Sequence, residues 1–258
     1  MYKKTTFVLR ALLFVVFTSL NILAQTNSVQ LATGGYWQAT PENQLVRKGI
    51  RDLYPQAYQT YTLRLQQFTK ALSAAPLQAY GANRPNPLTV ALPMPDGSMQ
   101  RYALVESPVM HPDLAARFPE NKTWTGQELP PPTATMRCSI TQFGFRAMII
   151  GNQGTIYIDP YGVGDLHNYI VFNKADFYAN NDLGYSCETN DSHFADDYHP
   201  NTETPAYRSN GVLRTYRAAF ACSKEFTNTH CGGTQSGGLA KVVEVINRLN
   251  TIYERDLS

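Results

Sequence analysis

The sequence has few charged residues, few cysteines and no block of basic residues, and each shortage excludes a class of protein. Only 16% of its 258 residues are charged, whereas 43% are hydrophobic and 12% are aromatic. Such a chain can bury a core and is not disordered throughout. Four cysteines are too few for a disulfide-dense scaffold of this length. Without a Lys- or Arg-rich block, no nucleic-acid partner is expected.

Motifs for common catalytic and cofactor chemistry are also missing. None of the five histidines stands four residues from another, so the sequence has no His-Glu-x-x-His helix. It has no Gly-x-Ser-x-Gly nucleophile elbow. The stretch Gly162–Gly164 lacks the third glycine and the following helix of a dinucleotide-binding loop. We therefore assign no catalytic residue and no metal ligand in this chain.

One small cluster, His193, Asp196, Asp197 and His199, has side chains of the types that bind zinc or calcium. It lies in residues 188–211, which are acidic, contain prolines and show no hydrophobic period. This composition is typical of a solvated linker. Because no regular element would fix the geometry of the ligands, we interpret the stretch as an acidic linker and not as a metal site.

The first 24 residues have the pattern of a secretory signal peptide. Two lysines precede an uncharged apolar run, Ala11–Leu20, and Ala24 is a small residue suited to cleavage, although Ile22 fits the cleavage pattern poorly. The run is short for a membrane span, so an uncleaved anchor is the less favoured alternative. The segment holds three cations and no acid, so its removal changes the net charge from +2 to −1. We expect a secreted, periplasmic or cell-surface protein with no membrane partner after cleavage.

Residues 25–187 predict an antiparallel, β-rich domain. Leu88–Leu92 and Met99–Val105 flank a Pro- and Gly-containing turn and predict a hairpin. Further strands are expected over residues 58–65, 133–140, 143–150, 154–159 and 166–173, which are rich in β-branched and aromatic side chains. A short helix is expected over 65–72, one or two helical turns over 111–118, and a frayed polar start over 25–40.

Residues 212–258 resume a regular pattern. Leu213–Cys222 predicts a strand, and apolar residues from Leu239 to Tyr253 recur at spacings of three and four, which predicts an amphipathic helix. One strand and one helix cannot form a domain, so this segment is interpreted as the start of a larger one. The alternative is that the strand and helix dock onto the preceding β unit and complete it.

The cysteines differ in their settings. Cys222 and Cys231 stand nine residues apart before a Gly-rich loop and are candidates for a local disulfide. Cys138 lies in an expected strand and is interpreted as a small buried hydrophobe. Cys187 lies at the join between the β unit and the linker, where a free thiol in an oxidising compartment is unusual unless it pairs or binds metal.

Eight segments, spread over most of residues 36–258, carry a family resemblance. They are Leu213–Phe226, Cys231–Thr234, Val245–Asp256, Tyr54–Tyr58, Leu92–Gly97, Val105–Leu114, Pro132–Thr135 and Gly154–Tyr161. The first three resemble the start of the catalytic domain of secreted bacterial reprolysin-like zinc metalloproteases, which belong to the metzincin class. The other five resemble the pro-region of the same proteins.

The resemblance implies an α+β chain with a signal peptide (1–24), an antiparallel β-rich pro-domain (25–187), the acidic linker (188–211) and the incomplete start of an α/β metzincin catalytic domain (212–258). Family members bind zinc through an extended three-histidine motif whose glutamate is the general base. That motif is not in this sequence. We therefore expect no cofactor in this chain and no peptidase activity from it alone.

The function implied is that of a pro-region that serves folding and latency of a secreted zinc endopeptidase. Its partner would be the catalytic domain of the parent protease, and peptides or proteins would be substrates of the complete enzyme. A thiolate on the open zinc position is one way to silence such an enzyme, and Cys187 is the candidate for that role. The alternative is a non-enzymatic extracellular β-rich module that binds protein or glycan through exposed members of its sixteen tyrosines.

Overall fold

A computed structural model describes residues 35–46, 49–79, 85–130, 132–180 and 218–257. The expected signal peptide, the acidic linker, the His193–His199 cluster and Cys187 lie outside the described residues, as do the proposed domain boundaries. The described strands are β1 (Trp37–Ala39), β2 (Gln59–Leu63), β3 (Leu88–Pro93), β4 (Met99–Glu106), β5 (Lys122–Glu128), β6 (Ala134–Thr141), β7 (Gly144–Gly151), β8 (Gly154–Pro160) and β9 (Asn168–Asn173). The described helices are α2 (Leu65–Leu72), α3 (Pro112–Arg117), α4 (Lys174–Asn180), α5 (Lys224–His230) and α6 (Gln235–Leu257), with a 3₁₀ turn, η1 (Glu42–Gln44).

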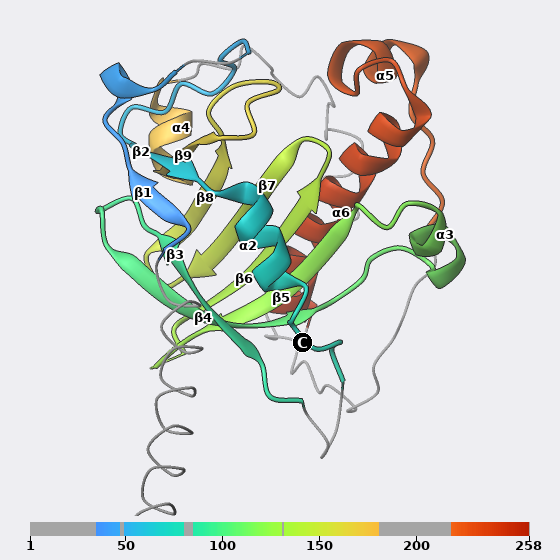
Figure 1. The fold of residues 1–258 in the computed structure, drawn as a ribbon, viewed down its shortest axis with the longest axis horizontal. Coiled ribbons are helices and arrows are strands. Elements are labelled where there is room, and N and C mark those ends of the chain that lie inside the picture. The colour runs from blue at the N-terminus through green and yellow to red at the C-terminus, as the bar shows by residue number, and fades with distance from the viewer. Residues whose placement is uncertain (1–34, 47–48, 80–84, 131, 181–217, 258) are drawn as a thin grey trace, which may run out of the picture.

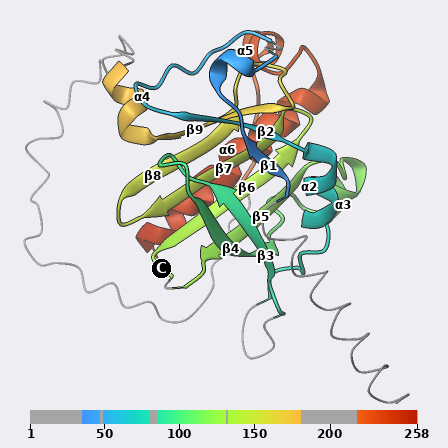
Figure 2. The ribbon, with the colours of Figure 1, turned by 60° about the vertical axis from the view of Figure 1, so that its left-hand side comes forward.

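All nine strands form one antiparallel sheet in the order β1-β2-β9-β8-β7-β6-β5-β4-β3. From β3 to β9 each strand pairs with the next one along the chain, and β2 then joins β9, with Tyr61 opposite Tyr169. The sheet curls around α2 into a nearly closed barrel, and α6 lies on its outer side (Figures 1 and 2). The α+β class and the antiparallel, β-rich character are therefore as predicted.

Helix α2 fills the inner side of this sheet. It connects β2 on one flank of the sheet to β3 at the opposite edge, and it buries Phe68 and Leu72 completely. The ring centroid of Phe68 lies 5.3 Å from that of Phe145 on β7 and 5.9 Å from that of Trp37 on β1. Because a buried side chain of this size contributes about 1.5–3 kcal/mol, α2 is a central part of the hydrophobic core.

Strand β6 shows how the sequence separates the two sides of the sheet. Met136, Cys138 and Ile140 are buried in the inner core, and the residues between them point to the outer side, as the two-residue period of a strand requires. Arg137 is one of those outer residues, and it is only 3% exposed. The outer side of β6 is therefore covered as well, and the element that covers it is α6 (Figure 1).

The local predictions are largely confirmed. The hairpin forms as β3 and β4, with Leu92 opposite Gln100. The strands expected over 133–140, 143–150, 154–159 and 166–173 appear as β6 to β9, and the helix expected over 65–72 is α2. Strands β1 and β5 and helices α4 and α5 were not predicted, and the presence of β1 corrects the expectation of a frayed start as far as residue 40.

The strand expected over Leu213–Cys222 is wrong for the part that the structure describes. Residues 218–222 are exposed and have no regular structure. The Ser223 hydroxyl instead accepts a hydrogen bond from the Phe226 amide at 3.1 Å and caps the start of α5. Within the described part, residues 218–222 pair with no strand, so the β propensity of their apolar side chains is not realised.

Helix α6 is longer than the expected span of Leu239–Tyr253 and packs on β6 and β7. Docking on the β unit is the arrangement kept above as the alternative for this helix, and the assignment of residues 212–258 to another domain stays a prediction. None of the helices in the described ranges is long and apolar enough to cross a membrane.

Replacing Phe68 with alanine removes the largest side chain that α2 contributes to the core. We expect the free energy of unfolding, measured by denaturant titration, to fall by about 3–5 kcal/mol. Gln67→Ala is the matched control, because Gln67 is exposed on the same helix. It should change the free energy by less than about 0.5 kcal/mol. Equal effects of the two substitutions would show that α2 is not a core element.

Candidate functional site

Helix α6 turns a polar face toward the sheet. Its buried side chains recur at spacings of three and four and none is more than 5% exposed: they are Ala240, Val243, Glu244, Asn247 and Thr251. Three of these five side chains are polar, which is unusual for the buried stripe of a helix on a sheet. We call this contact between α6 and the outer side of β6, β7 and β8 the α6 seat.

The apolar stripe of α6 points the other way. Val242, Ile246, Leu249 and Tyr253 each follow a residue of the buried set by two positions, which is about 200° around a helix. Tyr253 is 57% exposed and its neighbour Val245 is 51% exposed, while the other three are partly exposed. The amphipathic helix was predicted correctly, but of its predicted apolar residues only Val243 is fully buried, and most of the others lie on the outward side.

One half of the α6 seat is an ion-pair network around two buried acids. Asp159 on β8 accepts hydrogen bonds from Arg146 on β7, at 3.0 Å, and from Arg248 on α6. Glu244 on α6 accepts a hydrogen bond from the Thr141 hydroxyl at 2.6 Å. It also pairs with Arg146 at 3.3 Å and with Lys241 at 3.0 Å. Each acid therefore receives cations from both the sheet and the helix.

The ion pairs and the burial shift the pKa values of Asp159 and Lys241. Burial by itself would raise the pKa of Asp159, but the neighbouring Arg248 and Arg146 guanidinium groups outweigh burial and hold the pKa below its ordinary value of 3.8. Burial and the nearby Arg146 lower the pKa of Lys241, although Glu244 opposes them. Asp159 is thus ionised at neutral pH, and its contact with Arg146 and Arg248 is electrostatic.

The other half of the α6 seat is centred on Arg137. Its guanidinium donates to Asn247 and to Ser107, both at 3.2 Å, and to the carboxylate of Glu254 near the end of α6. The Asn247 amide in turn donates to the carbonyl oxygen of Cys138 at 2.9 Å. The last turns of α6 are therefore anchored to the backbone and a side chain of β6.

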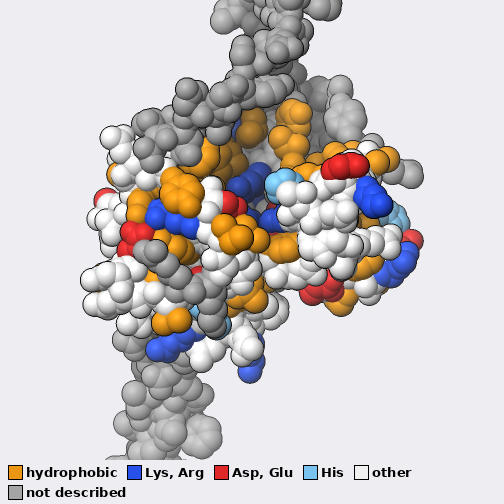
Figure 3. Space-filling model, turned by 90° about the horizontal axis from the view of Figure 1, so that it is seen from above, with side chains coloured by type: hydrophobic (Ala, Val, Ile, Leu, Met, Phe, Trp, Pro, Cys, Tyr) orange, Lys and Arg blue, Asp and Glu red, His pale blue; other side chains and the backbone are white. Residues whose placement is uncertain are grey.

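Seen from above, the molecule has a hollow in which Lys and Arg side chains lie, with acidic side chains nearby (Figure 3).

A second group of contacts is centred on Arg51, in the loop before β2. It donates to Glu42 at 2.9 Å and lies 4.8 Å from the ring centroids of both Tyr58 and Tyr161. These contacts tie that loop to the end of β8, and we interpret them as structural.

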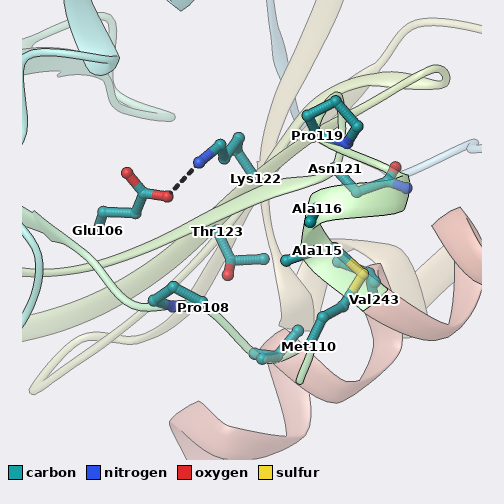
Figure 4. Close-up of a pocket in the computed structure, with 11 residues that line it drawn as sticks. Glu106, Pro108, Met110, Ala115, Ala116, Pro119, Asn121, Lys122, Thr123 and Val243 are labelled. Carbon is teal, nitrogen blue, oxygen red and sulfur yellow. Dashed lines mark hydrogen bonds and ion pairs between the residues drawn. The ribbon is translucent and has the colours of Figure 1, made fainter. Parts of the chain in front are cut away.

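A pocket of about 310 Å³ opens between α3, β5 and α6 (Figure 4). Its rim carries the ion pair between Glu106 and Lys122, whose oxygen and nitrogen are 2.5 Å apart. Asn121 lines the pocket and is 4% exposed, and neither its amide nitrogen nor its amide oxygen has a hydrogen-bond partner. The remaining lining is mostly apolar, and Val243 of α6 forms part of it.

The cysteines and histidines singled out from the sequence do not form a common site among the described residues. Cys138 is buried as expected, and burial raises the pKa of its thiol. Cys222 and Cys231 are free thiols in the structure, so the disulfide between them stays a prediction. Within the described ranges, no group of three or more His, Cys, Asp or Glu side chains is placed to hold a metal.

Comparisons with protein-family models, curated proteins and solved structures find no match. The family resemblance therefore remains a hypothesis that rests on the sequence motifs alone.

Sequence reasoning missed Arg137, Asp159 and Glu244. A weak signal for Arg137 was available, because a charged residue stands among the apolar and small residues of β6. Glu244, Asn247 and Thr251 also stand at helical spacing. Nothing in the sequence shows that these positions meet, since 103 residues separate Thr141 from Glu244 and 117 separate Arg137 from Glu254.

Replacing Asp159 with asparagine leaves two arginines without their shared carboxylate. We expect a loss of about 3–5 kcal/mol in the free energy of unfolding at pH 7. Because the folded-state pKa of Asp159 is lowered, the stability it contributes is present above its ordinary value of 3.8 and is lost as the pH falls through the lower folded value. The gap between Asp159→Asn and wild type, measured by denaturant titration across pH, should therefore shrink in acid. Asp113→Asn, at an exposed position, is the control; a gap that is constant with pH would contradict the pairing.

Proposed function

We propose that this chain is the N-terminal pro-region of a secreted, reprolysin-like metzincin zinc endopeptidase together with the first helix of its catalytic domain. In this proposal it serves folding and latency and does not itself catalyse. The observation that supports the proposal is the orientation of α6, whose largely polar face lies on the β unit while most of its apolar stripe points away.

Within one domain, a helix buries its apolar stripe against the sheet. Helix α6 buries only Ala240 and Val243 of its apolar side chains, and much of its contact with the sheet consists of hydrogen bonds and ion pairs such as those of Arg137 and Asp159. Contacts between domains are more polar than contacts inside one. An outward stripe of Val242, Ile246 and Leu249 also suits a helix whose own core lies in another unit. That unit would be the parent catalytic domain.

No zinc is assigned to this chain in the proposal. Zinc sites use three or four His, Cys, Asp or Glu side chains, and the described residues offer no such group. Zinc and peptide substrates would belong to the complete enzyme, where zinc would activate water. In this chain the polar face of α6 is held on the sheet by Arg137, Asp159 and Arg146. The latency role of Cys187 stays a prediction outside the described residues.

The direct test is the reading frame beyond Ser258. We expect a His-Glu-x-x-His sequence in frame within roughly 150 residues, about the length of one domain. Because the two histidines of this motif lie on one face of a helix, the motif is specific for a zinc peptidase. A stop codon directly after Ser258, or a following domain without the motif, would remove the basis of the proposal.

The outward side of α6, where Val245 lies beside the apolar stripe, gives a second test. We expect Val245→Gln to change the free energy of unfolding of this chain by less than about 0.5 kcal/mol, because Val245 is exposed. In the longer gene product the same change should reduce the yield of folded catalytic domain. The adjacent Glu244→Gln is the matched control on the inward face, and it should destabilise this chain by about 1–3 kcal/mol. A large loss in this chain from Val245→Gln would show that the stripe is already packed here.

A further inference from the structure

We propose that the ion-pair network around Asp159 and Glu244 binds the carboxylate of a ligand through the unused N–H donors of Arg146 and Arg248. Such a ligand would bridge strand β7 and helix α6. This inference does not rest on the proposed function. It rests on the number of charges in the network, on their exposure to solvent and on the donors that the two arginines leave unused.

The network holds three cations and only two acids. Asp159 is shared by Arg146 and Arg248. Glu244 is shared by Arg146 and Lys241. No other acid in the described ranges forms an ion pair with these cations. The network therefore carries one positive charge in excess, and a single carboxylate would balance it.

Solvent meets the cations of the network and not its acids. The side chains of Asp159 and Glu244 are 4% and 6% exposed, whereas those of Arg146 and Arg248 are 19% and 28% exposed. A ligand that approaches from solvent therefore meets positive charge first. Because these cations are partly withdrawn from water, their attraction for an anion is stronger than that of fully exposed side chains.

The two arginines keep donors that no residue uses. Arg248 donates through Nη2 to Asp159, Arg146 donates to the same oxygen through Nη1, and the Nε atom of Arg146 lies 3.3 Å from Glu244. The other nitrogens of both side chains have no hydrogen-bond partner among the described residues. Of all these nitrogens, only Arg146 Nε is both buried and without a hydrogen bond, so the unused donors are open to solvent. Since both guanidinium groups meet at Oδ1 of Asp159, they are close enough to share a second carboxylate.

Aromatic rings hold the cations of α6 in position. The guanidinium carbon of Arg248 lies 5.1 Å from the ring centroid of Tyr157, and the Lys241 nitrogen lies 4.3 Å from that of Phe143. Contacts with ring faces orient a cation but leave its charge in place. The network is thus ordered before a ligand arrives, which lowers the entropic cost of binding.

Two further charged groups respond to the excess charge. Burial lowers the pKa of Lys241 most, Arg146 lowers it further, and Glu244 opposes both. Asp52 is exposed, and its charge also acts on Arg146, although it forms no ion pair there. A carboxylate bound at Arg146 should therefore raise the pKa of Lys241, and Asp52 should repel that carboxylate.

The experiment is a titration of the full chain with acetate at constant ionic strength, in which acetate replaces chloride. We expect saturable chemical-shift changes at the side-chain N–H groups of Arg248, a rise in the pKa of Lys241 measured from its side-chain carbon shifts, and a rise in the unfolding temperature with acetate concentration. Acetamide, a neutral molecule of the same shape, should bind at least about tenfold more weakly. Equal effects of acetate and chloride, or no saturable shift at Arg248, would overturn the proposal.

A second probe identifies the source of the carboxylate. The N-acetyl, N-methylamide derivative of L-glutamate carries the same group on a peptide unit. Binding at least about tenfold tighter than that of acetate assigns the site to an acidic side chain of a protein, and equal affinity assigns it to a small carboxylic acid. Either result supports a carboxylate site, and failure of both probes to bind contradicts it.

Three variants separate the charge of the network from the stability of the fold. Asp52→Asn removes an exposed acid and leaves every ion pair of the network intact, so it should tighten acetate binding at least about twofold. Lys241→Gln removes one cation and should weaken binding at least about threefold. Lys70→Gln, exposed on α2 at the inner side of the sheet, is the control and should bind as wild type does. If either of the first two variants binds with unchanged affinity, the network does not hold the ligand.

Discussion

The charges between α6 and the sheet have to be paired, because a buried ion without a partner costs several kcal/mol. Asp159 meets this requirement with one arginine from the sheet and one from α6, and Glu244 meets it with Arg146, Lys241 and the Thr141 hydroxyl. Moving α6 by one residue would rotate its side chains by about 100° and separate these groups. Charge pairing, and not apolar packing, therefore fixes where the helix lies.

Because the contact between α6 and the sheet is largely polar, the helix can separate from the β unit. Separating α6 from the sheet would return charged and polar groups to water, where they are well solvated, whereas the core around Phe68 would stay intact. The helix and the β unit can thus be two partners that meet through a polar surface. This property is what a pro-region needs if it is to hold the first helix of a catalytic domain and later release it, and the proposal of a metzincin pro-region depends on it.

The pocket at α3 depends on the same contact, because Val243 belongs to the buried side of α6. Its polar feature is different in kind from the α6 seat. Every charged side chain of the seat is matched by an opposite charge, whereas the Asn121 amide is matched by nothing in the described structure.

The sequence by itself determined the elements that depend on near neighbours in the chain: the hairpin of β3 and β4, the alternation in β6, and helices α2 and α6. It did not reveal β1, whose three residues form a strand because β2 lies beside them. It predicted the amphipathic helix α6 but not that Glu244, Asn247 and Thr251 are the side chains that face the sheet. Only the tertiary structure decided this, by bringing Arg137 and Asp159 from distant strands beneath the polar face of the helix.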